Sequence, residues 1–546
     1  MSYRHRKIAV ATLLAILLPA SSGLRADESP AEIDTAKLEA DEVVIGAIVF
    51  EKQDIFDLEN PKENNALYRL LNRLHIVTKD SVIDKQLLFK SGDRYSKRLS
   101  DESERILRTN SYFYDASITP KNRQDGTVDL HVNTRDVWTL RPGLSISRSG
   151  GETETAIKLE ESNLLGRGQR IFVSQSSDVD RDSTALFFSD NHLGLNWTSI
   201  SMGFSNNSDG NTSLFSLLRP FYALDAKWAA GVTAFDEDKR STLYLLGESA
   251  AEYRHERRSY TAFGGWSAGL RDGWVRRYTA GFVLDDNQFS NVIDATLPPV
   301  IPDDRKLAYP FFGIEFLENR FETATNRDQI ERTEDFLIGT RLTATVGWSD
   351  ESFGADRDAV VYSMRASRTF GKLAESALLL TARASGRIES GDTANALFHV
   401  VARYYQQLSE KRTFFATFRG THGRNLDLDN VVELGGDTGL RGYPTRYQTG
   451  DSKVLLTLEQ RIFTDWYPFR LVRVGGAVFA DVGRSWGENP LAEEDHGWLS
   501  DVGVGLRFAP TRAGTGRMLH LDVAFPLNGD ESIDSVQVLL EAKRGF

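Results

Sequence analysis

The feature that most constrains the fold is an alternation of apolar and polar residues with a period of two. It begins near Val137 and continues to the end of the chain. In the segment Lys453–Phe463, Leu456 and Leu458 fall on one face and Glu459 falls on the other. Such a segment is a strand whose two faces meet different surroundings. Most of the chain is therefore expected to be β-sheet with one apolar face.

The strands of a soluble β-sandwich would alternate in the same way. Strand length and loop pattern therefore have to distinguish a sandwich from a membrane barrel. The strands are about 9–12 residues long, enough to cross a bilayer when tilted. Short polar turns alternate with longer acidic loops: Leu165–Gly168 and Leu270–Gly273 against Ser177–Ser183, Asp285–Lys306 and Gly487–His496. No helical layer is expected to cover an open sheet, and closure removes its edges. We therefore predict an all-β transmembrane antiparallel barrel over residues 141–546, with about twenty strands by count.

The ends of the barrel follow from parity. An even number of strands leaves the amino-terminal segment and the carboxyl terminus on the same side, which we expect to be the periplasm, with the long acidic loops outside the cell. The last strand, Val536–Phe546, is expected to place Val538, Leu540 and Phe546 on its apolar face. Assembly machinery for outer-membrane barrels reads a last strand of this kind, which is consistent with a bacterial outer-membrane protein.

The amino-terminal part has a different pattern. Residues 1–26 have the basic, apolar and small-residue regions of a secretory signal peptide. Residues 27–42 are expected to be a polar leader. Residues 43–140 are predicted to be a small α+β domain, in which Leu67, Leu70, Leu71 and Leu74 recur at helical spacing. No later window of 18 apolar residues predicts a membrane-spanning helix.

Composition excludes several classes of chemistry. The formal net charge of −12 argues against a nucleic-acid-binding protein, which would carry a basic face. The absence of cysteine excludes disulfides, cysteine-ligated zinc and iron–sulfur clusters.

The densest turn signal is Leu434–Pro444, in which four glycines surround Arg441. One interpretation is a solvent-exposed surface turn. The other is a loop that enters the barrel, because a buried guanidinium needs acidic partners. Strand parity places Glu459 and Asp481 on the lumen face of neighbouring strands. Arg441 is therefore expected to bridge them as an internal latch.

These residues resemble a known family, the polypeptide-transporting outer-membrane barrels that include BamA, TamA and the two-partner secretion transporters. Leu440–Tyr443, with Arg441, Gly442 and Tyr443, is similar to the family's arginine–glycine motif on the loop that folds into the lumen. Phe479–Gly483, with Asp481 and Gly483, resembles the motif on a following strand, and Glu459 matches the acidic residue between them. Asn163–Gly168 resembles the first periplasmic turn, and residues 43–140 resemble one polypeptide-transport-associated (POTRA) domain.

The resemblance implies a barrel of sixteen strands, fewer than the count of about twenty, and it implies a translocation or insertion factor. The POTRA domain would capture an unfolded client polypeptide, and the barrel would pass or insert it. Outer-membrane lipid or lipopolysaccharide, periplasmic chaperones and accessory lipoproteins would be further partners. The alternative is a passive pore or a structural barrel that anchors periplasmic partners.

Enzymatic motifs are weak, and neither a cofactor nor a metal is predicted. Gly265–Gly269 matches the Gly-x-Ser-x-Gly elbow around Ser267, but the elbow needs a helix after its strand, and a strand pattern surrounds it here. The acidic run Asp178–Asp182 could hold a divalent ion or be a solvated loop. A non-enzymatic function is therefore expected.

Overall fold

The computed structural model describes residues 33–124, 126–194, 197–293, 297–488, 497–514, 516–530, 533–543 and 545–546. The proposed signal peptide lies outside the described residues, as do residues 27–32 of the leader and most of the loop Gly487–His496. No helix in the described ranges has the length and apolarity needed to cross a membrane.

An α+β domain comes first. Its sheet has the order β1-β3-β2, with β1 parallel to β3 and β2 antiparallel to it. Helix α4 packs on this sheet, and the core includes Ile45, Leu107, Phe113 and Leu130. The elements are α1 (Thr35–Ala40), β1 (Val44–Gln53), α2 (Ala66–Leu74), α3 (Asp80–Asp84), α4 (Lys97–Arg108), β2 (Phe113–Gln124) and β3 (Thr127–Asp136).

The expected polar leader is wrong for its second half. Asp34 caps α1 by accepting hydrogen bonds from the N–H groups of Ala36 and Lys37. Leu38 is fully buried in the core of the domain. Because α1 contributes a core side chain, it belongs to the α+β unit rather than to a linker.

The rest of the chain closes into an antiparallel barrel, and twenty strands form it among the described residues. The count from the alternation is confirmed, and the sixteen strands implied by the resemblance are wrong for this chain. The barrel strands are β4 (Leu140–Ser149), β5 (Glu152–Glu161), β6 (Gln169–Ser177), β7 (Asp182–Leu193), β8 (Thr198–Asn207), β9 (Gly210–Arg219), β10 (Trp228–Leu245), β11 (Glu248–Arg271), β12 (Trp274–Ser290), β13 (Arg305–Glu318), β16 (Arg341–Ser349), β17 (Ala359–Lys372), β18 (Ser376–Glu389), β19 (Asp392–Ser409), β20 (Arg412–Arg424), β23 (Ser452–Phe463), β24 (Val472–Trp486), β25 (Leu499–Pro510), β26 (Met518–Pro526) and β27 (Gln537–Lys543).

Several strands are longer than expected. β10 has 18 residues, β11 has 24 and β12 has 17. The pairing of β10 with β11 continues to Leu245–Glu248 at the far end of the hairpin. Alternation carries no mark of where a strand leaves the membrane, so the sequence underestimated these lengths.

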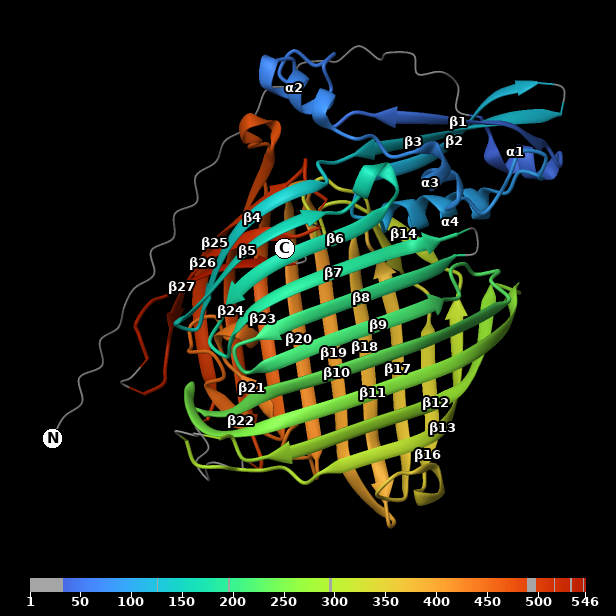
Figure 1. Ribbon diagram of the computed structural model, residues 1–546. Helices are drawn as coiled ribbons and strands as arrows, with labels where there is room; N and C mark the ends of the chain where they lie inside the picture. The colour runs from blue at the N-terminus through green and yellow to red at the C-terminus, as the bar shows by residue number, and fades with distance from the viewer. Residues whose placement is uncertain are drawn as a thin grey trace.

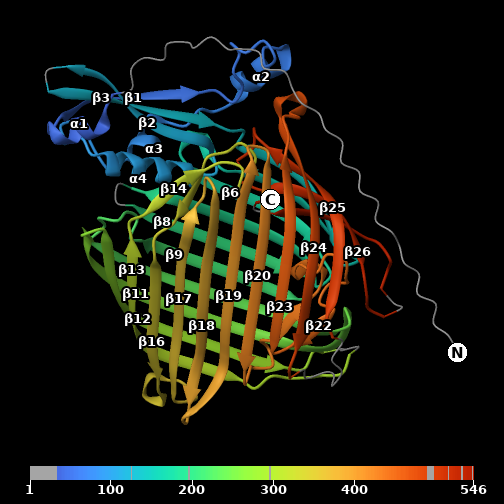
Figure 2. The ribbon, with the colours of Figure 1, turned by 180° about the vertical axis from the view of Figure 1, so that it is seen from behind.

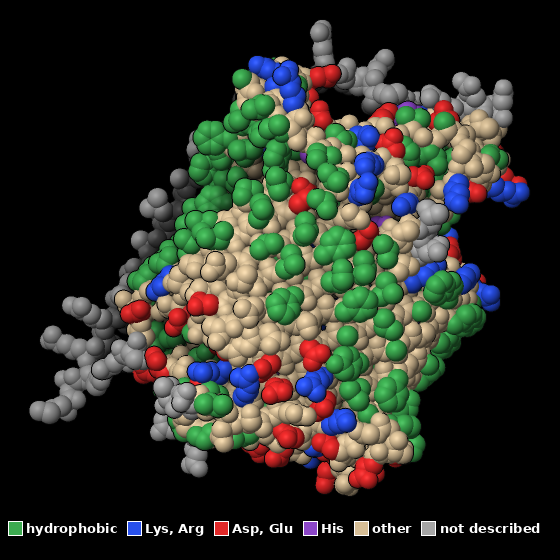
Figure 3. Space-filling model, viewed as in Figure 1, with side chains coloured by type: hydrophobic (Ala, Val, Ile, Leu, Met, Phe, Trp, Pro, Cys, Tyr) green, Lys and Arg blue, Asp and Glu red, His purple; other side chains and the backbone are tan. Residues whose placement is uncertain are grey.

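The outward face of the barrel is apolar. Phe204, Leu456, Val478 and Val504 are exposed, whereas Glu459 and Asp481 are buried inside, as the alternation predicts. Figure 3 shows hydrophobic side chains over the barrel wall and charged groups gathered toward the rim farthest from the α+β domain. A closed sheet with an apolar outer belt is the construction of a barrel that spans an outer membrane.

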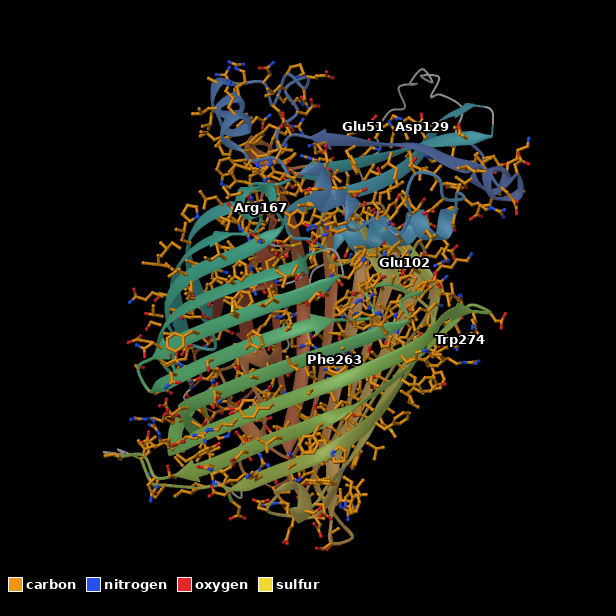
Figure 4. All side chains as sticks on the ribbon, turned by 45° about the vertical axis from the view of Figure 1, so that its right-hand side comes forward. Glu51, Glu102, Asp129, Arg167, Phe263 and Trp274 are labelled. Carbon is orange, nitrogen blue, oxygen red and sulfur yellow. The ribbon has the colours of Figure 1, made fainter. Side chains whose placement is uncertain are left out.

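The α+β domain covers one mouth of the barrel (Figures 1 and 2). The Lys79 N–H donates to the carbonyl of Gly166, in the turn between β5 and β6. Glu102 on α4, labelled in Figure 4, accepts a hydrogen bond of 2.7 Å from the N–H of Leu224, in the turn between β9 and β10. These two turns therefore lie at the domain end of the barrel, and the loop that carries Arg441 starts from the opposite end.

The orientation expected for Phe546 is wrong. Val538 points outward on β27, but the regular strand ends at Lys543 and Phe546 is buried with Phe463, Ile330 and Met518. Arg461 donates a hydrogen bond of 3.1 Å to the main-chain oxygen of Phe546. The chain turns into the lumen after β27, so strand parity does not extend to its last residue.

Candidate functional site: an arginine loop inside the barrel

The loop between β20 and β23 folds into the barrel. It contains β21 (Val432–Leu434), the 3₁₀ turn η3 (Gly436–Thr438) and β22 (Gln448–Gly450), and the two short strands pair with each other. Leu434, Leu440 and Tyr443 are fully buried in a cluster that also holds Tyr447, Leu455 and Leu499. The segment Leu434–Pro444 therefore does not form an exposed surface turn.

The glycines let the backbone of this loop pack closely. A Cβ on Gly436 would lie 2.5 Å from the carbonyl oxygen of Tyr443, and one on Gly435 would lie 2.4 Å from that of Pro444. Gly439 has a φ of +121°, which other residues adopt only with strain. These contacts fix the turn that carries Arg441.

Arg441 lies between two buried carboxylates. Its Nε and Nη2 donate to the two oxygens of Asp481 at 2.7 and 3.1 Å, and its Nη1 donates to Glu459 at 2.9 Å. The guanidinium carbon stands 3.4 Å from the centre of the Phe479 ring. Burial alone would lower the pKa of Arg441, but Asp481 and Glu459 raise it above its usual value. The guanidinium is therefore charged at neutral pH.

The neighbouring glycine and tyrosine hold the same loop. The Gly442 N–H donates to Asp501 on β25 at 3.0 Å, and a Cβ there would lie 2.6 Å from that of Asp501. The Tyr443 hydroxyl is 2.8 Å from the carbonyl oxygen of Ser500 and 2.9 Å from that of Asn528. Gly483 leaves room for the loop, because a Cβ there would lie 3.1 Å from Leu434.

The charged network extends beyond the residues that the sequence indicated. Asp522 on β26 lies 3.7 Å from Arg441 Nη1 and accepts a hydrogen bond of 2.5 Å from Arg507 on β25. Arg461 Nε donates to Glu459 at 3.1 Å. Sequence reasoning missed Asp522, although the alternation in Met518–Pro526 places it on the buried parity. Four successive strands, β23 to β26, thus contribute carboxylates around the loop.

A second ion pair ties the loop to the wall near the far rim. Arg446 donates to both oxygens of Asp180 at 3.0 and 2.8 Å, and Tyr244 also donates to Asp180. Burial raises the pKa of Asp180, but the hydrogen bonds from Arg446 and Tyr244 outweigh it and lower the pKa overall. Asp180 of the acidic run is therefore engaged by an arginine. Within the described ranges, no group of three or more His, Asp or Glu side chains is arranged to hold a metal ion.

Ser267 lies in β11 without the geometry of a nucleophile elbow. It is fully buried, its hydroxyl accepts a hydrogen bond of 3.0 Å from the N–H of Gly269, and β11 continues to Arg271. No helix follows this strand before β12 begins at Trp274.

A separate loop fills the barrel mouth beneath the domain. Residues 319–340 carry the paired strands β14 (Phe321–Ala324) and β15 (Glu334–Leu337). Arg108 of α4 donates to both oxygens of Asp335 at 2.7 Å. Arg461 lies 3.3 Å from Asp328. This loop thus connects the α+β domain to the network around Arg441.

Glu334 in this loop is expected to make the stability of the barrel depend on pH. Its burial, then the charge of Asp328, raises its pKa from 4.5 to about 7. The folded state therefore favours the protonated acid, so stability should fall by up to about 3 kcal/mol as pH rises from 4.5 through about 7, and then level off. We expect Glu334→Gln to remove this slope, measured as the temperature at which the barrel unfolds against pH. Glu375→Gln, an exposed carboxylate at the same end, should retain it.

The barrel closes weakly where its first and last strands meet. Leu540 on β27 and Arg148 on β4 form the paired position between these strands in the described chain. By contrast, β4 pairs with β5 along Leu140–Ser149, and β26 pairs with β27 along Met518–Ala524. A cavity of about 660 Å³ lies beside this seam, lined by residues that include Leu140, Ser145, Met518 and Ala542.

The geometry defines a closed antiparallel barrel with a lumen-facing arginine loop, a weak seam and an α+β domain over one mouth. No family model matches the chain. A curated protein of Treponema pallidum (strain Nichols), described as an outer membrane protein assembly factor, is 32% identical over 117 residues. That stretch covers 20% of this chain and only 14% of the relative.

Solved structures with a similar arrangement include CdiB from Escherichia coli, at 14% identity and a TM-score of 0.46, covering 91% of this chain and 76% of that one. CdiB from Acinetobacter baumannii has 13% identity and a TM-score of 0.44, covering 92% and 73%. BamA from Haemophilus ducreyi lacking POTRA domains 1–3 has 12% identity and a TM-score of 0.35, covering 91% and 84%.

Proposed function

We propose that the chain is an outer-membrane protein of the BamA/TamA type that translocates or inserts polypeptides. The α+β domain would be its single POTRA domain, facing the periplasm together with the carboxyl terminus. Its client would be an unfolded polypeptide, and the barrel would work without an enzymatic step. Outer-membrane lipid or lipopolysaccharide and periplasmic chaperones or lipoproteins would be further partners.

The observation that carries this proposal is the seam. From Leu140 to Ser147, the edge of β4 that faces β27 has no strand partner among the described residues, because the pairing of β4 with β27 is limited there to Arg148 and Leu540. An unpaired strand edge is a template for adding another strand. A seam with one paired position among the described residues can open sideways at a small cost. A client strand could use such an opening, whereas a diffusion pore does not need one.

The arginine loop would act as the latch of this seam. On one side it holds β26 through Asp522 and the loop after β26 through Asn528. On the other side, the Thr445 N–H donates to the carbonyl of Gly150, in the turn after β4, at 3.1 Å. The loop therefore spans the seam from inside, so its release would be coupled to opening.

A disulfide across the seam tests the function. The chain has no cysteine, so Arg148→Cys/Leu540→Cys creates a single pair at directly opposed positions. In proteoliposomes, the oxidised variant should not accelerate folding of a urea-unfolded outer-membrane barrel polypeptide. A reductant should restore the acceleration.

Arg148→Cys alone is the matched control and should be insensitive to oxidation. Unchanged acceleration in the locked barrel would contradict the proposal. Large, steady conductance that the lock does not alter would instead favour the passive pore.

A further inference from the structure

Helix α2 exposes an apolar stripe. Leu67, Leu70 and Leu74 are 59%, 51% and 61% exposed, although they lie on one side of the helix, and Ile76 just after it is 52% exposed. Arg69 and Arg73 lie on another side of the helix and are also exposed. The sequence indicated an amphipathic helix, and an apolar stripe of this kind normally packs against a core. Here, among the described residues, three leucines of the stripe keep more than half of their surface uncovered.

This stripe has a fixed position. The Tyr68 hydroxyl, on the neighbouring side of α2, donates to the carbonyl of Phe469 in the turn between β23 and β24. Tyr68 stacks on Phe56, with ring centres 4.0 Å apart. The side-chain amide of Asn72 donates to the Phe56 carbonyl at 2.8 Å and accepts from its N–H at 3.1 Å. α2 is therefore held against the rim of the barrel wall.

The rim beside α2 has the character of a membrane interface. Trp466 and Phe469 in that turn are 60% and 81% exposed. Aromatic side chains at the ends of barrel strands mark the level of the lipid headgroups. Figure 3 shows hydrophobic side chains gathered over α2 and on the barrel wall below it. The apolar stripe is thus continuous with the lipid-facing belt.

We propose that α2 is an interfacial helix that inserts Leu67, Leu70 and Leu74 into the lipid leaflet on the domain side. Its apolar side would lie at the headgroup boundary, and the exposed Arg73 guanidinium would reach anionic headgroups, with Arg69, which donates to the Asn64 side chain, exposed beside it. The bilayer is favoured over a partner protein because the stripe adjoins a surface that lipid already covers. The domain would then be anchored to the membrane as well as to the barrel. This inference rests on the barrel lying in a membrane and not on its transporting polypeptides.

Site-directed spin labelling tests this placement on the full chain, which has no native cysteine. A nitroxide at Leu70→Cys, in vesicles of phosphatidylethanolamine and phosphatidylglycerol, should collide severalfold more with oxygen than with a water-soluble nickel chelate. A label at Lys90→Cys, an exposed position after α3, should show the reverse. Adding Leu67→Ser and Leu74→Ser should raise the nickel accessibility at position 70 severalfold, while the heat resistance of the barrel confirms folding.

Two results would overturn the lipid assignment. The first is a label at position 70 that meets the nickel chelate as often as the label at position 90, which would leave the stripe free for a partner protein. The second is protection of the label at position 70 from the nickel chelate that disappears when the protein is diluted with lipid. This result would identify a second copy of the chain as the occupant. Neither result depends on client folding, so the proposed transport function would stand or fall separately.

Discussion

Replacing Arg441 by alanine should lower the free energy of unfolding of the barrel by about 3–5 kcal/mol. The change leaves Asp481 and Glu459 buried without the cation that lies between them. It also removes the contact of the guanidinium with Phe479. The measurement is the temperature at which the compact, fast-migrating form of the barrel converts to the unfolded form in detergent gels.

Arg446→Ala is the matched control for this prediction. It removes the same side chain from the same loop, but its partner Asp180 is only partly buried, so we expect a loss of about 1 kcal/mol or less. Arg441→Lys should fall between the two, because an ammonium keeps the charge and loses the two-pronged contact with Asp481. Equal losses in Arg441→Ala and Arg446→Ala would mean that the buried network does not hold the loop.

The pairing that this prediction tests followed from two local signals. Alternation placed Glu459 and Asp481 on the inner face, and glycine density marked the turn that carries Arg441. Neither signal gives the distance between the loop and the strands, so the sequence could not indicate that the loop reaches four of them. Asp522 was missed because its approach to Arg441 depends on the closure of the whole barrel.

Other differences have the same physical origin. The pattern of residues 27–42 indicates a polar leader because α1 contributes only one core side chain, Leu38. A single apolar residue cannot show the periodicity of an amphipathic helix. The lengths of β10 and β11 were underestimated because paired strands continue to alternate beyond the bilayer. The exposure of Leu67 and Leu70 was equally hidden, since an amphipathic pattern does not distinguish a protein core from a lipid surface.

The inward turn of Phe546 leads to the second large effect. Phe546→Ala should destabilise the purified, refolded barrel by about 3–5 kcal/mol, the range for removing a buried phenylalanine. The ring packs 4.9 Å from that of Phe463 and lies beside the guanidinium groups of Arg461 and Arg507. Its loss would leave a cavity among charged groups that are otherwise screened from water. The temperature of unfolding in detergent measures the effect without any cellular assembly step.

Val538→Ala on the outward face of β27 is the control, and it should cost about 1 kcal/mol or less because its side chain is exposed on the outside of the barrel. The comparison also separates two roles for the last residue. If Phe546 serves only as a signal for assembly machinery, the refolded variant should match the parent in stability and lose only cellular yield. If it closes the lumen, stability should fall in both settings. The network then depends on the Phe546 ring as well, because this ring packs beside Arg461, which donates to Glu459, the carboxylate that Arg441 also engages.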